Sequence, residues 1–428
     1  MFIQDLPVNV KFVIEGMEEA GSPALEKLVQ KEKAGFFSSV DYIVISDNLW
    51  ISRRTPALTY GMRGNSYFMV EVLADGSRLE VDPCWGTRGE EGEQTPPRGH
   101  GPGDHGVLGL GEFMKPPAVN ACAVCAQEPV VEMPQWAGLI QGLGCARWCD
   151  GEGGEVSQDI AHGEAERMHR GIQVKCRDQD FHSGTFGGIL NEPMADLVAL
   201  LGSLVDSSGR ILIPGIYDHV APVTEEEKRT YEAINLDLEE YRKSSQVKKF
   251  LFDTKEELLM HLWRYPSLSI HGIEGAFHEP GAKTVIPGRV IGKFSIRLVP
   301  HMNMSVVEKQ VRQHLDYIFS KRNSSNQMTV SMTLGLHPWT ANTRDNQYLA
   351  AKRAIKTVFG TEPDMIRDGS TIPIAKIFQD TIQKSVLMLP LGAVDDGEHS
   401  QNEKINRWNY IEGSKLFAAF FLEMAKLH

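Results

Sequence analysis

The feature that most constrains the fold of this sequence is a long segment, residues 73–174, that interrupts a β-strand pattern. Residues 67–72 have strand character that stops abruptly, and an alternating pattern resumes over 175–180. The segment holds 18 of the 40 glycines, 8 of the 22 prolines and five of the six cysteines, and its apolar residues follow neither a helical nor a strand period. We therefore predict that residues 73–174 form a disordered or loosely folded insertion within one structural element.

The cysteines of this segment leave one alternative open. Cys122 and Cys125 are followed by Cys145 and Cys149, and four thiolates at this spacing could close a tetrahedral zinc shell. No apolar strand supports such a site. The sequence therefore favours cysteines that bind no metal.

Composition excludes several classes of protein. The chain has 428 residues, is 42% hydrophobic and 23% charged, and carries a formal net charge of −12, which is typical of a soluble globular protein of two or three domains. The acidic excess argues against nucleic acid as a partner, and no apolar run reaches the ~18 residues that a membrane helix needs. The first residues lack the pattern of a signal peptide, which predicts a cytoplasmic chain, whereas sequons at Asn303 and Asn323 are compatible with secretion of a longer relative.

The patterns outside the insertion predict an α/β protein with a second domain inside the first. Residues 8–14 alternate as a strand does, and 42–45 and 386–389 are short apolar runs typical of buried parallel strands. The middle of the chain combines half-buried antiparallel strands at 290–298 and 330–334 with amphipathic helices, which indicates a two-layer α+β module. We predict a parallel-sheet domain from residues 1–64 and 352–428, and an inserted α+β domain from 65–72 and 175–351.

Potential metal ligands follow the predicted parallel strands. Glu18 and Glu19 come after the strand that ends near Ile14, Asp47 follows the run ending at Ile45, and His399 follows the strand through Leu389. Ligands bind outside the carboxyl ends of strands in such sheets, so these four side chains are expected at one edge. Carboxylate and imidazole groups suit zinc or manganese, and the set would support metal-assisted hydrolysis.

Six ordered motifs resemble the carnosine dipeptidase branch of the M20 metallopeptidases. They are GMEEAGS at 16–22, ISDN at 45–48, DFHSG at 180–184, WRYPS at 263–267, FSIRLVP at 294–300 and DDGEHSQNE at 395–403. The resemblance implies a catalytic domain with an inserted lid and dimerisation domain. It also implies a zinc-dependent homodimer, with two zinc ions per subunit or manganese in their place, that hydrolyses small Xaa-His dipeptides.

The resemblance also implies roles for single residues. Glu18 would be the general base, and the metal ligands would be Glu19, Asp47 and His399. His182 would stabilise the oxyanion in the active site of the partner subunit. The terminal carboxylate of the substrate would be held by Arg297 with Thr284 and Thr371.

The sequence departs from the family pattern at its start. Family members carry a His-x-Asp motif and a metal-bridging aspartate upstream of the strand that leads to the paired glutamates, and this chain begins at that strand. No triplet elsewhere is expected to replace that motif, so we expect an N-terminally incomplete catalytic domain with three of the five protein ligands. The alternative function is a non-catalytic form that dimerises with a full-length dipeptidase and regulates it.

Overall fold

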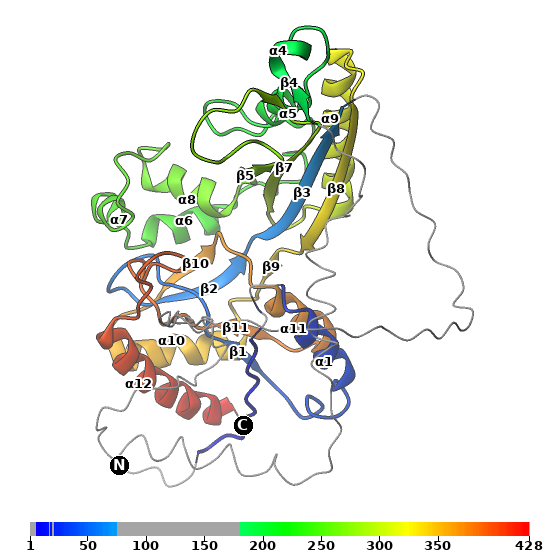
Figure 1. Cartoon of the computed structure of the whole chain (residues 1–428). Helices are drawn as coiled ribbons and strands as arrows, with labels where there is room; N and C mark the ends of the chain where they lie inside the picture. The colour runs from blue at the N-terminus through cyan, green and yellow to red at the C-terminus, as the bar shows by residue number, and fades with distance from the viewer. Residues whose placement is uncertain (1–5, 17, 19–20, 75–179, 428) are drawn as a thin grey trace, which may run out of the picture.

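The computed structural model describes residues 6–16, 18, 21–74 and 180–427. These residues form two main sheets that lie end to end (Figure 1). The lower, five-stranded sheet has the order β1-β11-β2-β10, with β9 paired to β2. The upper, four-stranded sheet has the order β5-β7-β3-β8, and the short strands β4 and β6 pair beyond its far end.

The sequence predicted a parallel lower sheet, but the sheet has both parallel and antiparallel pairs. Its strands are β1 (Ile43–Ile45), β2 (Ala57–Met62), β9 (Trp339–Thr340), β10 (Asp364–Asp368) and β11 (Val386–Met388). β1 runs parallel to β11 and β10 runs parallel to β2, but β2 is antiparallel to both β11 and β9. The two apolar runs therefore do form a buried parallel pair.

Helices cover both faces of the lower sheet. They are α1 (Pro23–Lys31) and α11 (Pro373–Ile382) on one face, and α10 (Asn346–Phe359) and α12 (Arg407–Met424), with the 3-10 turn Ala425–Leu427, on the other. Alternate residues of β11 point to the two faces, because Val386 and Met388 pack with α1 and α11 whereas Leu387 packs with α10 and α12. The result is a three-layer α/β/α unit.

Within the described part of the chain, helices cover one face of the upper sheet. Its strands are β3 (Gly64–Leu73), β5 (Ser267–Glu274), β7 (Arg289–Leu298) and β8 (Gln327–Leu336), and the helices are α5 (Pro193–Gly202) and α9 (Met304–Arg322). Phe68, Phe294 and Leu298 are fully buried in the core that these helices cover, whereas alternate residues of β7 such as Lys293 and Arg297 face the other way. The predicted two-layer α+β module is therefore present.

The chain leaves the upper sheet after β3 and returns at β4 (Phe181–His182) in unbroken register. Leu73 lies opposite Arg289, and the amide of Ala74 donates to the carbonyl of Gly288 at 2.9 Å. The amide of Gly288 in turn donates to a carboxylate oxygen of Asp180 at 3.2 Å, and Phe181 then pairs with Ile286 in β6 (Val285–Ile286). Asp180 thus takes the place that the residue after Ala74 would occupy in one continuous strand.

This register moves the predicted start of the insertion. Leu73 is the last residue of β3 and only 4% exposed, and Ala74 is also buried, so both belong to the sheet and not to the insertion. The rest of the predicted insertion lies outside the described residues. All six cysteines, and with them the possible thiolate zinc site, also lie outside the described residues.

One further predicted boundary differs from the structure, and one segment of the inserted domain packs on the lower sheet. The boundary after residue 351 falls inside α10, which packs against α12, and the passage between the sheets comes at 337–339. The helices α6 (Glu225–Ala233), α7 (Leu238–Ser244) and α8 (Lys255–Trp263) pack on the lower sheet at β10, because their apolar residues share a core with Trp50 and Ile366. Part of the predicted inserted domain therefore packs against the lower sheet.

The predicted strand over residues 8–14 does not form. These residues are assigned to no strand in the part of the chain that the structure describes, and Phe12 and Ile14 are 54% and 60% exposed. Alternation identifies a strand only when a neighbour completes its hydrogen bonds, and no described strand pairs with this stretch. Among the described helices, none is both long and apolar enough to cross a membrane.

Candidate active site

The turn that carries Glu18 lies where the two sheets meet. The amide of Gly21 donates to the carbonyl of Glu18 at 2.8 Å, and a Cβ added to Gly21, which has a φ of +87°, would lie 3.7 Å from Leu334 near the end of β8. Before the turn, Glu15 is only 7% exposed and accepts a 2.9 Å hydrogen bond from Ser22. Burial raises the pKa of the Glu15 carboxyl, and the hydrogen bond from Ser22 opposes that shift. Glu19 lies outside the described residues.

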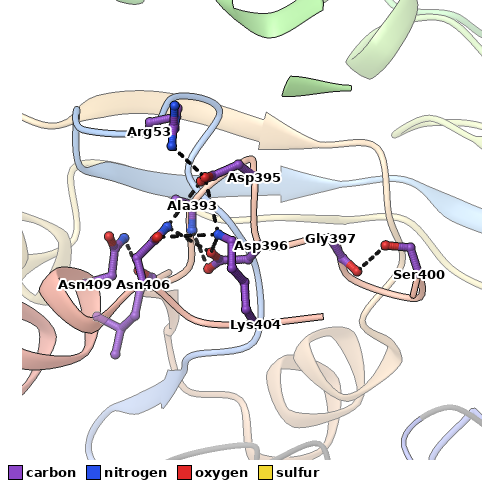
Figure 2. A network of polar contacts seen from close by, with 10 residues as sticks. Arg53, Ala393, Asp395, Asp396, Gly397, Ser400, Lys404, Asn406 and Asn409 are labelled. Carbon is purple, nitrogen blue, oxygen red and sulfur yellow. Dashed lines mark hydrogen bonds and ion pairs between the residues drawn. The ribbon is translucent and has the colours of Figure 1, made fainter. Parts of the chain in front are cut away.

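Asp47 and His399 follow neighbouring parallel strands, as the sequence predicted. Ile45 of β1 lies opposite Met388 of β11, and the amide of Leu389 donates to the carbonyl of Ile45 at 2.8 Å. Beyond the strand ends, Leu49 forms a parallel bridge with Gly392, so the loops carrying Asp47 and His399 leave the sheet side by side. A network of polar contacts then holds the His399 loop (Figure 2).

Asp47 and His399 have side chains that suit a divalent metal, but two ligands do not make a complete site. Carboxylate oxygen and imidazole nitrogen are common zinc and manganese ligands, and Asp47 and His399 present one of each from adjacent strand ends. Within residues 6–16, 18, 21–74 and 180–427, however, no group of three or more His, Cys, Asp or Glu side chains is placed to hold an ion. The third expected ligand, Glu19, is not among them.

Arg297 and Thr371 meet at the junction of the sheets. Arg297, near the lower end of β7, donates through Nη1 to the Thr371 hydroxyl at 2.7 Å, and that hydroxyl donates to the carbonyl of Arg63 at 2.7 Å. Arg63 lies between β2 and β3 and is 8% exposed. Its own guanidinium donates to the carbonyl of Gly369 and to Ser267, both at 2.9 Å, so it joins the loop after β10 to the upper sheet.

Among the described residues, the cluster has more positive than negative charge. Arg63 and Arg297 lie close enough to repel each other, and Asp368 is the carboxylate that acts on both. Burial, together with Arg297, lowers the pKa of Arg63 to about 10 against the opposing effect of Asp368, and burial lowers the pKa of Arg297 as well. Both guanidinium groups stay protonated at neutral pH. Two cations around one carboxylate, partly shielded from water, are well suited to bind a further anion such as a carboxylate.

Asp368 also links this cluster to the Asp47 loop. Asn48, which follows Asp47 and is 4% exposed, donates through Nδ2 to Asp368 at 3.1 Å and to Thr59 at 2.6 Å. The possible metal ligand and the possible carboxylate site therefore belong to one connected region.

His182 and Thr284 lie at the opposite end of the upper sheet. His182 pairs with Val285, its Nδ1 accepts the amide of Gly184 at 3.1 Å as the N-cap of α4 (Ser183–Phe186), and the Thr284 carbonyl accepts the amide of Ser183 at 3.1 Å. Residues 289–296 of β7 separate this pair from Arg297, a span of about 27 Å at ~3.4 Å per residue. Within one chain, therefore, Thr284 does not join Arg297 and Thr371 as the sequence reasoning expected.

Three members of the site had no role predicted from the sequence, although Asn48 belongs to the ISDN motif at 45–48. Arg63, Asp368 and Asn48 matter because segments distant along the chain meet at the junction, and nothing in their local pattern predicts that meeting. The one His-x-Asp triplet of the chain, at 314–316, has a different role. His314 lies in α9 and contacts the hydroxyl and carbonyl of Ser203, so it belongs to helix packing in the upper unit.

Comparison with known proteins identifies the family. Residues 165–323 match the peptidase dimerisation domain, M20_dimer. The chain is 64% identical to human beta-Ala-His dipeptidase over 99% of its own length, and it spans 64% of that protein. The crystal structure of human carnosine dipeptidase 1 superposes with a TM-score of 0.71 at 63% identity, over 99% of this chain and 67% of that one. The chain belongs to the M20 peptidase family.

A second solved structure supports the same M20 fold at lower identity. The dipeptidase Dug1p from Saccharomyces cerevisiae gives a TM-score of 0.72 at 36% identity, again over 99% of this chain and 67% of that chain. The lower α/β/α unit and the upper α+β unit are thus the catalytic and dimerisation parts of the M20 fold. The described part of the match to the dimerisation domain runs from β4 to α9. It includes elements of the upper unit and the α6–α8 segment.

Proposed function

We propose that the protein hydrolyses dipeptides that have a free terminal carboxylate, of the Xaa-His type such as beta-Ala-His, in a metal-dependent reaction. One observation carries this proposal: the cationic Arg63–Arg297 cluster is connected through Asp368 and Asn48 to the strand end that bears Asp47. A substrate bound there by its carboxylate would extend its peptide bond toward the end of β1 and β11.

Different residues would bind the metal, transfer the proton and bind the substrate carboxylate. Glu19, Asp47 and His399 would hold zinc, two ions per subunit with the help of further ligands, or manganese in its place. When bound, the metal supplies an activated water and polarises the scissile carbonyl. Glu18 would take the proton from the attacking water and return it to the leaving amine. Arg297 would bind the terminal carboxylate of the substrate. Its hydrogen bond to Thr371, which in turn donates to the carbonyl of Arg63, would fix the orientation of the Arg297 guanidinium.

The other site residues would come from a second copy of the chain. His182 and Thr284 adjoin each other but lie a sheet's length from Arg297, so they cannot act on the same substrate as Arg297 of their own chain. A homodimer through the dimerisation domain would bring this pair to the partner's active site, where His182 would stabilise the oxyanion.

Replacing Arg297 with methionine tests the carboxylate site. We expect the KM for a dipeptide to rise about 10- to 150-fold, because a charged hydrogen bond of ~1.5–3 kcal/mol is lost. A dipeptide with an amidated C-terminus should bind equally poorly to both proteins. The control is Arg289→Met, which removes an arginine from the same face of β7 at its far end, where it pairs with Glu71. Equal KM values for wild type and Arg297→Met would contradict the assignment.

We also propose that residues 75–179 are an insertion into a strand that otherwise runs from β3 into β4. A variant joining Ala74 directly to Asp180 should keep the fold, with a Tm within a few degrees of the parent, because the register opposite 285–298 does not change. Thermal unfolding followed by circular dichroism measures this. A variant joining Leu73 to Asp180 is the control, since it shifts Phe181 and His182 by one residue and should be less stable. Loss of cooperative unfolding in the first variant would refute the insertion.

One observation favours a second function, a non-catalytic partner that pairs with a complete dipeptidase. The described residues of the upper unit form a continuous apolar core, whereas the described residues supply no group of three metal-binding side chains. Such a partner would offer His182 and Thr284 to the other subunit while its own site stayed inactive. It would bind one metal ion or none and show no turnover alone, and that outcome separates it from the enzyme.

A further inference from the structure

The loop that carries His399 has an unfavourable backbone conformation. His399 has a φ of +57° and Asn402 a φ of +62°, a left-handed region that side chains other than glycine rarely adopt. Gly397 also has a positive φ, and its carbonyl accepts the amide and the hydroxyl of Ser400 in a tight turn. Such a conformation persists only when the surrounding structure holds it in place.

A buried carboxylate closes this loop at its base. Asp396 is 4% exposed, and its Oδ2 accepts the amide of Ala393 at 2.9 Å. Its Oδ1 accepts Lys404 Nζ and Asn406 Nδ2, each at 3.0 Å, and its backbone carbonyl accepts the amide of Lys404 at 2.9 Å. Residues 396 and 404 are therefore joined by main chain and side chain, which closes the segment 396–404, and His399 belongs to that segment. Figure 2 shows the contacts of Asp396 with Lys404 and Asn406.

The same base is anchored to the neighbouring loop. Asp395 pairs with Arg53 at 3.0 Å and with Lys404 at 3.3 Å. The carbonyl of Gly392 accepts the amide of Trp50 at 2.8 Å, and a Cβ at Gly392 would come within 2.2 Å of Leu49. The closed segment 396–404 is thus fixed against the segment that follows Asp47.

We propose that Asp396, Lys404 and Asn406 form a positioning clip that fixes the conformation of the loop carrying His399, which leaves the sheet next to the Asp47 loop, for metal binding. None of the three is a ligand, and the clip acts only through the conformation of the loop. The inference rests on the proposed function, because it assigns the clip a purpose only if His399 binds metal. Groups that orient metal ligands typically change metal affinity by about 10- to 100-fold when they are removed.

Lys404→Met tests the clip with little risk to folding, because the side chain of Lys404 is 45% exposed and the backbone bond to Asp396 remains. We expect zinc affinity, measured by competition with a chromophoric chelator, to fall about 10-fold or more. Hydrogen exchange of the 397–403 amides in metal-free protein should become faster. Lys404→Arg should restore both properties. Lys415→Met, which removes a surface pair with Glu412 on α12, should change neither.

The outcomes separate the clip from the proposed function. Faster exchange with unchanged zinc affinity would show that the clip is merely structural and would overturn the inference while leaving the function intact. Unchanged exchange would overturn it as well. A wild-type protein that binds no zinc at all would overturn the proposed function, and the inference with it.

Discussion

Mixing two inactive variants, Glu18→Gln and His182→Ala, is expected to restore about a quarter of the wild-type activity. In the mixed dimer, the subunit with an intact Glu18 receives the intact His182 of its partner, so one of its two sites is complete. Random pairing of equal amounts makes half of the dimers mixed. Each variant alone should be reduced by about 10²-fold or more, the usual effect of removing an oxyanion-stabilising donor or a general base.

The test requires that subunits exchange, which mild dissociation and reassociation of the mixture ensures. Mixing His182→Ala with itself under the same treatment is the control. Activity that stays at the level of the single variants after exchange would contradict the assignment of His182 to the partner's site.

Replacing Glu227 with glutamine is expected to destabilise the protein by about 3–5 kcal/mol, because it leaves two buried guanidinium groups without their carboxylate. Glu227 Oε1 lies 2.9 Å from Arg264 Nε and 2.9 Å from Arg367 Nη2, and it accepts the Tyr231 hydroxyl at 2.9 Å. The side chains of Arg264 and Arg367 are 3% and 14% exposed, so water cannot take the place of the lost charge. The cluster also joins α6 to β10, so the Tm should fall by about 10 °C.

The adjacent residue gives a matched control for this change. Glu226 pairs with Arg344 at 3.2 Å, and both side chains are 80% exposed, so Glu226→Gln should leave the Tm unchanged. Equal Tm values for the two variants would show that the α6–α8 segment does not depend on Glu227 for its attachment to the lower unit.

Patterns within single elements predicted much of the fold. The apolar runs that became β1 and β11 and the alternation along β7 placed the two sheets and two of the candidate ligands, because burial on one or both faces of a strand leaves a direct trace in the sequence. The alternation over residues 8–14 failed for a physical reason. Periodicity reports which side chains could be buried, whereas a strand also needs a hydrogen-bonding neighbour.

The rest depends on contacts between distant segments. Arg63 contacts Ser267, Gly369 and Thr371, which lie at least 200 residues away along the chain, and no local pattern records such a meeting. The separation of Thr284 from Arg297 is equally invisible in the sequence, since it follows from the length and direction of β7. The packing of α6–α8 against the lower sheet is invisible in the sequence for the same reason.

The most direct test of the proposed function is the metal content of the purified protein, read with hydrolysis of beta-Ala-His by wild type and by Glu18→Gln. We expect about two zinc ions per chain in both proteins, turnover by wild type, and loss of turnover in the variant while the metal stays bound. One ion or none, with no turnover by wild type, would contradict it and leave the protein as a non-catalytic member of the M20 family.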